Sequence, residues 1–119
     1  MRYVDGFVIP IATKNIPAYR LMAKKASKFW LEHGALEFRE CVGDDLKVNM
    51  GVPFTSLAKV KRNETVVFSW IVYKSRAHRD RVNAKVVKDP RLAKMMAGKN
   101  MPFDIKRTSF GGFKVIVDA

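Results

Sequence analysis

An acidic residue stands inside an otherwise apolar segment near the start of the chain. Asp5 lies within "YVDGFVIPI", where an ionised carboxylate would be costly to bury without a partner. One interpretation is an acid with a raised pKa that accepts a proton during catalysis. The other, which we favour, is a structural ion pair with a basic residue such as Arg39.

Polar residues that could form a site also follow the apolar start of "VFSWIVYKSRAHRDRVNAKV", residues 67–86; they are Arg79, Asp80 and Asn83. On a helix that starts at Arg76, Arg79 and Asn83 lie on the apolar side, so their polar ends should be partly buried. Asp80 lies in the first turn, where a negative charge interacts favourably with the helix dipole. A purely structural role for these residues is the alternative to a functional one.

These residues suggest a small cleft near the start of that helix. In this hypothesis arginines orient an anionic group, aromatic side chains form an apolar wall, and an aspartate accepts a proton. The protein would then be a small-molecule-binding protein or an enzyme that works without a cofactor. The predicted ligand-binding residues are Phe7, Arg39, Trp70, Arg79 and Asn83, and the predicted catalytic residues are Asp5 and Asp80.

Alternation in "ALEFRECV", residues 35–42, predicts a strand with Glu37, Arg39 and Cys41 on one face. Glu37 and Arg39 could neutralise each other, or they could line a cavity together with Asp5. Cys41 is the only cysteine, so an intrachain disulfide is impossible. A lone cysteine in a strand is usually a small apolar residue.

No metal or cofactor site is predicted. Asp44 and Asp45 follow Gly43, and although carboxylates can bind a hard cation, turn chemistry explains all three residues. His33 and His78 do not fall into a ligand spacing. The sequence also contains no glycine-rich phosphate loop.

The chain is strongly basic, with 23 Lys and Arg against 11 Asp and Glu and a net charge of +12. This charge attracts anionic ligands and polyanions, so an RNA-binding protein is the alternative function. Phe68, Trp70 and Tyr73 could then stack on bases. RNA is the less favoured partner, because the aromatic signature of RNA-recognition motifs is missing and charge alone gives only nonspecific attraction.

With 119 residues, 48% of them hydrophobic, the chain is predicted to form one domain, residues 1–119. The start "MRYVDGFVIPIA" predicts a strand rather than a signal peptide. No apolar run approaches the roughly 20 residues that a membrane span needs. We therefore expect a cytoplasmic protein without a membrane partner.

The elements that position these residues alternate between strands and helices. Strands are predicted at 3–11, 35–42, 66–73 and 109–118, and helices at 16–34, 76–87 and 90–97, with Asn15, Ser75 and Asp89 as N-caps. In residues 46–65, "LKVNMGVPF" could extend a strand and "TSLAKV" could form one helical turn. Gly111 and Gly112 indicate a bulge or a close backbone approach. The order is that of an α+β, ferredoxin-like βαββαβ domain, a four-stranded antiparallel sheet with helices on one face.

Apolar residues occupy both faces of the predicted sheet. Phe68 and Trp70 lie opposite Val67 and Ile71 in the third strand, yet the helices can cover only one face. Each large side chain left in water forgoes roughly 1.5–3 kcal/mol of burial. We therefore expect a homodimer in which two sheets pack face to face.

Several motifs together resemble the bacterial YbaA-like family over nearly the whole chain. They are "YVDGFV", "ECVGDD", "VFSWIVYKSRAHRDRVNAKV", "DPR", "MPFDIKR" and "GGFKVIVD". The resemblance implies a ferredoxin-like protomer that pairs as a dimeric α+β barrel, and it places the family motif on Trp70, Arg79, Asp80 and Asn83. It implies no particular activity. Ile105 stands where the family commonly has glycine, which argues against a left-handed turn there.

Overall fold

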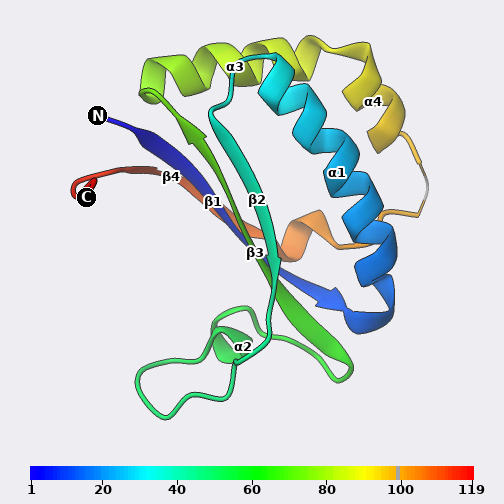
Figure 1. The fold of residues 1–119 in the computed structure, drawn as a ribbon. Coiled ribbons are helices and arrows are strands. Elements are labelled where there is room, and N and C mark those ends of the chain that lie inside the picture. The colour runs from blue at the N-terminus through cyan, green and yellow to red at the C-terminus, as the bar shows by residue number, and fades with distance from the viewer. Residues whose placement is uncertain (99) are drawn as a thin grey trace.

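The computed structural model describes residues 1–98 and 100–119, and its sheet has four antiparallel strands (Figure 1). Strand β1 (Tyr3–Ala12) pairs with β3 (Glu64–Tyr73) on one side and β4 (Ser109–Lys114) on the other. Strand β2 (Glu37–Val42) pairs with β3, which gives the order β2-β3-β1-β4. This order and the βαββαβ succession of the main elements confirm the predicted ferredoxin-like fold.

Three helices cover one face of the sheet (Figure 1). They are α1 (Ile16–Glu32), α3 (Arg76–Lys88) and the short α4 (Pro90–Met96), which packs against both others. The apolar sides of α1 and α3 face the sheet, as the spacing of their apolar residues predicts. Among the described helices, none is long and apolar enough to cross a membrane.

Two of the three predicted helix caps are confirmed. Ser75 and Asp89 accept hydrogen bonds from backbone N–H groups in the first turns of α3 and α4, at 3.1 and 2.9 Å. Asn15 occupies the predicted N-cap position of α1, but its side chain accepts no capping hydrogen bond, and its Nδ2 instead donates to the Pro102 carbonyl at 3.2 Å. Asn15 therefore ties the start of α1 to the chain that leads into β4.

The segment between β2 and β3 extends beyond the sheet and contains α2 (Phe54–Leu57), the predicted helical turn (Figure 1). The Phe54 and Phe68 rings lie 5.8 Å apart, so this segment contacts one end of the sheet face opposite the helices. Two short 3₁₀ helices, η1 (Thr13–Asn15) and η2 (Ile105–Arg107), precede α1 and β4. Ile105 is not left-handed, in agreement with its residue type.

Strand β4 is shorter than predicted and ends at Lys114. Its register with β1 is continuous through both glycines, so the bulge considered for this strand is wrong. The other alternative, a close approach, is confirmed at Gly112, where a Cβ atom would overlap the Tyr3 ring of β1. At Gly111 a Cβ would meet only Phe113, at 3.9 Å.

The substitution Gly112→Ala is expected to lower the free energy of unfolding by about 1–3 kcal/mol, because the added methyl forces Tyr3 to move. Gly111→Ala is the matched control, since its methyl makes an ordinary contact, and it should leave stability unchanged or raise it. Urea unfolding followed by tryptophan fluorescence measures both. Equal stability of the two variants would contradict the close approach.

The apolar core falls into two clusters under the helices, and Phe7 contacts both. One cluster surrounds Tyr73 and Val82 where β1 begins, and the other surrounds Ile9 and Val67 where β1 ends. The side chains between the two clusters do not fill the space completely. The cavity that remains is the candidate site.

Candidate functional site

Asp5 and Arg79 form an ion pair between β1 and α3. Asp5 faces the helices and is only 5% exposed, and Arg79 Nη1 lies 2.6 Å from its Oδ1. Arg79 Nε also donates to Asp80 Oδ1 at 2.8 Å, and its guanidinium lies 4.9 Å from the centroid of the Tyr3 ring, a cation–π contact. An ion pair for Asp5 was predicted, but Arg39 as its partner is wrong.

Asn83 connects this ion pair to the neighbouring elements. Its Oδ1 accepts hydrogen bonds from Trp30 Nε1 of α1 at 3.1 Å and from the Tyr73 hydroxyl of β3 at 3.2 Å. Asn83 and Tyr73 also lower the pKa of the nearby Asp5 carboxylate. In the described part of the chain no buried side-chain polar atom lacks a partner, which is typical of a closed structural network.

Burial raises the pKa of Asp5 above its ordinary value, against the opposing effects of the Arg79 charge and of the hydrogen bonds that Asp5 accepts. A raised pKa suits a proton acceptor. However, the Asp5 carboxylate is already paired with Arg79, and the Asp80 side chain is 61% exposed to solvent. Neither predicted catalytic aspartate lines the cavity described below.

The predicted cleft does not form as a single site, because its members lie on opposite faces of the sheet. Trp70 and Arg39 are cross-strand partners on the face away from the helices. Phe7 and Arg79 lie on the helix side, where Phe7 lines the cavity and Arg79 belongs to the ion-pair network. Arg39 also borders the cavity from the edge strand.

Glu37 and Arg39 neutralise each other, as one of the two alternatives predicted. Arg39 Nη2 lies 3.6 Å from Glu37 Oε1. The alternative that these residues share a cavity with Asp5 is wrong, because strand alternation places Asp5 on the helix side. Cys41 is exposed on the same face as Glu37.

A cavity of about 330 Å³ lies between α1 and the helix-covered face of the sheet. It occupies the gap between the two core clusters, and its walls are largely apolar. The sheet, α1, α4 and the chain before β4 all contribute to it. Among its lining residues are Phe7, Ile9, Ile71, Met22, Ala26, Trp30, Leu92, Met95 and Phe103.

Glu40 of β2 is the only carboxylate among the described residues that line this cavity. The Tyr19 hydroxyl of α1 donates to Glu40 Oε1 at 2.7 Å, and Ser69 lies directly opposite on β3. Glu40 as a residue is exposed on the edge strand, but partial burial of its carboxylate raises its pKa, against the lowering effects of Tyr19 and Ser69. Burial also raises the pKa of Tyr19, so its hydroxyl stays protonated and remains a donor.

Glu40, Tyr19 and Ser69 were not predicted as site residues from the sequence. A signal for Glu40 exists in the alternation of strand β2, which places this carboxylate between Phe38 and Val42 on one face. A carboxylate on an apolar strand face is the same signal that identifies Asp5. Tyr19 belongs to the apolar stripe of α1 and carries no separate signal.

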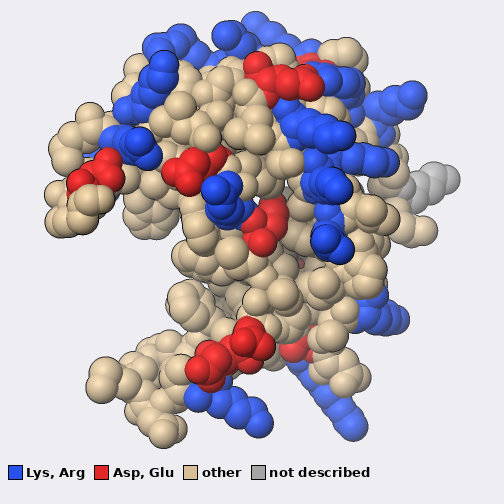
Figure 2. Space-filling model, viewed as in Figure 1, with Lys and Arg blue, Asp and Glu red and all other residues tan. Residues whose placement is uncertain are grey.

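The cavity borders a groove between α1 and the exposed edge of β2. Glu40 and Tyr19 line both spaces, and the groove adds the exposed basic residues Arg20 and Lys24. Figure 2 shows basic side chains along α1 beside a hollow in the middle of this surface. The mouth of the cavity is therefore positively charged, which favours an anionic group.

Helix α4, which helps to close the cavity, is held by a cluster of charged residues. His33 Nε2 lies 2.8 Å from Asp89 Oδ2, and Arg91 Nη2 pairs with Asp89 and Glu32 at 2.7 and 2.6 Å. Hydrogen bonds from Arg91 and His33 hold the pKa of Asp89 well below its ordinary value. The cluster fixes α4 against the end of α1 and so places Leu92 at the cavity.

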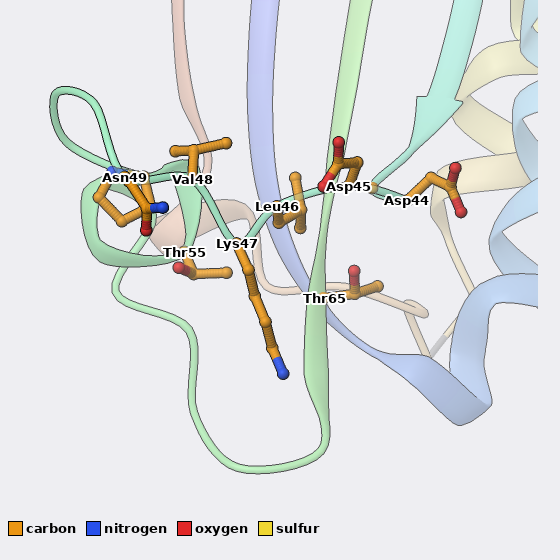
Figure 3. A pocket seen from close by; sticks show the side chains of 10 residues that line it. Asp44, Asp45, Leu46, Lys47, Val48, Asn49, Thr55 and Thr65 are labelled. Atoms are coloured by element: carbon orange, nitrogen blue, oxygen red, sulfur yellow. The ribbon is translucent and has the colours of Figure 1, made fainter.

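The turn after β2 does not bring its carboxylates together. Figure 3 shows the Asp44 and Asp45 side chains pointing in different directions, with Lys47 extending from the same loop. Among residues 1–98 and 100–119, no group of three or more metal-ligating side chains is found. Turn chemistry remains the explanation for these aspartates.

The sheet order and the one-sided helix layer define a ferredoxin-like α+β protein. The chain belongs to the family described as "Protein of unknown function (DUF1428)", whose model matches residues 2–105. It is 44% identical to "Uncharacterized protein YbaA" of Escherichia coli (strain K12) over 118 residues, which cover 99% of each chain. The resemblance inferred from the motifs is thus confirmed.

Solved structures share the fold at low sequence identity. SnoaB, a cofactor-independent oxygenase from Streptomyces nogalater, aligns with a TM-score of 0.63 and 10% identity, covering 98% of this chain and 95% of its own. A dimeric ferredoxin-like protein from an uncultured marine organism aligns with a TM-score of 0.56 and 13% identity, covering all of both chains. At these identities the similarity establishes the fold alone.

Proposed function

We propose that the protein is a single-domain homodimer that binds a small, mostly apolar acid in the cavity between α1 and the sheet. The cavity carries this proposal, because an apolar space of about 330 Å³ with a few polar groups at one end is the usual form of a small-molecule site. The fold shared with a cofactor-independent oxygenase supports a small-molecule role without assigning a reaction.

The chemistry of the lining defines the ligand. An apolar body fits between Ile71 and Ala26, and its acidic group lies at the mouth near Arg20 and Lys24. Arg79, predicted from sequence to orient an anion, is already neutralised by aspartates. Arg20 and Lys24 at the mouth of the cavity bind the anionic group instead.

The dimer is proposed from the sheet face that the helices leave open. Phe68 is 43% and Phe113 62% exposed, and Val4, Val8 and Trp70 surround them in one apolar groove. A contiguous apolar patch of this kind marks an interface. A second copy of the chain presents the same surface, so two sheets can pack face to face. One structural neighbour is itself described as dimeric.

RNA binding, the alternative function, would need exposed aromatic residues and basic residues on one surface. Their positions disfavour it. The exposed aromatic residues lie on the open sheet face. The basic residues of α1 lie on the helix side of the sheet (Figure 2). An RNA strand that stacks on Phe68 and Trp70 would therefore not reach them.

Isothermal titration calorimetry with 2-naphthoate, an apolar acid of suitable size, tests the site. Ala26→Leu fills the cavity and is expected to weaken binding by about tenfold or more, since overpacking costs about 1–3 kcal/mol. Ala84→Leu, on the exposed side of α3, is the matched control and should bind as the wild type does. Equal affinity of both variants would place the ligand elsewhere, and absence of binding to the wild type would refute the proposal.

A further inference from the structure

The polar end of the cavity combines a carboxylate, two hydroxyl groups and an apolar wall in one place. Glu40 accepts a hydrogen bond from Tyr19 at 2.7 Å and lies opposite Ser69 on the neighbouring strand. All three residues line the same cavity as Phe38 and Ile71. Glu40 itself is exposed on the edge strand, so an accessible carboxylate borders an apolar wall there, and a carboxylate in this position can accept a proton from a ligand beside that wall.

We propose that Glu40 is a general base that removes a proton from a carbon acid bound in the cavity, and that Tyr19 is its positioning residue. This inference rests on the proposed function, because the substrate must first enter the cavity. It adds a reaction class, proton transfer next to an activating carbonyl group. It also assigns the proton acceptor to β2 rather than to Asp5 or Asp80.

The reaction needs no reactant beyond the substrate. A Glu40 oxygen takes the proton of a C–H bond next to a carbonyl, and the electron pair of that bond moves to form the enolate. Where the substrate carries a β,γ-double bond, this enolate is a dienolate, and return of the proton from Glu40 to the γ-carbon moves the double bond into conjugation, so atoms and charge balance. The Tyr19 hydroxyl holds the carboxylate in place through both steps.

The groups that face Glu40 come from three elements. Helix α1 presents Tyr19, Arg20 and Lys24, β3 presents Ser69, and Arg39 precedes Glu40 on its own strand. Burial raises the pKa of Glu40, and the hydrogen bond from Tyr19 acts in the opposite direction.

The ring opening of 5-nitrobenzisoxazole tests the base with a defined carbon acid. A carboxylate takes the proton from the ring C–H, its electron pair forms a nitrile, and the N–O bond breaks to leave a coloured phenolate. Glu40→Gln should lower the rate per protein by about 100-fold. Glu37→Gln, a carboxylate on the same strand but on the other face, should leave the rate unchanged.

The pH profile distinguishes a positioning role for Tyr19 from a structural one. The hydrogen bond from Tyr19 favours the ionised form of Glu40, so Tyr19→Phe should move the midpoint of the rate profile to higher pH. An unchanged midpoint would overturn the role of Tyr19. 2-Naphthoate should compete with the reaction, because both probes occupy the cavity.

The outcomes separate this inference from the proposed function. If Glu40→Gln reacts as fast as the wild type while 2-naphthoate still binds, Glu40 is not the base and the cavity remains a binding site. If neither variant nor wild type binds 2-naphthoate or opens the ring, both proposals fail. Circular dichroism of each variant confirms that the fold is retained.

Discussion

The substitution Arg79→Ala is expected to lower the free energy of unfolding by about 3–5 kcal/mol, because it leaves the buried Asp5 carboxylate without its cation. Asp5 lies under α3, where Asn83 and Tyr73 would remain as nearby polar groups. The cation–π contact with Tyr3 is lost as well. Among the substitutions that we propose, Arg79→Ala is the one that we expect to reduce stability most.

The penalty should depend on pH in a definite direction. Burial raises the pKa of folded Asp5 above its ordinary value of 3.8, so the folded state binds the proton more readily than the unfolded state. The contribution of Asp5 to the free energy of unfolding therefore increases as the pH falls through the pKa that Asp5 has in the folded state. Without Arg79 the folded pKa rises further, so the penalty is greatest at neutral pH and shrinks in acid.

Arg81→Ala provides the control, because Arg81 lies on the exposed side of the same helix. It should change stability by no more than about 0.5 kcal/mol. Urea unfolding at one fixed protein concentration compares the variants, since the stability of a dimer depends on concentration. A penalty for Arg79→Ala as small as that for Arg81→Ala would show that the ion pair is dispensable.

Trp70→Asp is expected to convert the proposed homodimer into monomers. Trp70 lies in the centre of the open sheet face beside Phe68, with ring centroids 5.6 Å apart. A tryptophan in the centre of an interface commonly contributes 2 kcal/mol or more, and a charge buried in its place adds a desolvation cost. Together these effects should weaken association by about 100-fold or more.

Sedimentation velocity at micromolar concentration measures the change in mass. Leu21→Asp is the matched control, because Leu21 is 66% exposed on α1 and should stay outside the interface. Phe113→Lys, on β4, tests the same face with a second residue in case Trp70→Asp does not fold. A monomeric wild type, or a Trp70→Asp variant that remains dimeric, would refute the sheet-to-sheet dimer.

The sequence was sufficient to predict the fold because local patterns and global topology agree. The β-branched and aromatic residues at 66–73 predict β3, and the cap at Ser75 predicts the start of α3; both are confirmed. The end of β4 was misjudged, because apolar residues continue past Lys114 although pairing with β1 stops there. Apolar residue types alone do not report where a neighbouring strand ends.

The site was harder to predict, because it depends on which strand faces meet. The sequence identifies Asp5 as a buried carboxylate and Arg79 as partly buried, yet it does not reveal that they pair across 74 positions of the chain. Trp70 and Phe7 are both apolar and central, but register places them on opposite faces. Glu40 becomes prominent only when the two core clusters leave a cavity beside it.

Binding of an apolar acid in the cavity between α1 and the sheet can be tested by an NMR titration of methyl-labelled protein with 2-naphthoate. We expect the methyl signals of Ile9, Met22 and Ile71, which line the cavity, to shift together and to saturate. Shifts confined to Val4 and Val8 on the open sheet face, or no shifts at all, would contradict it.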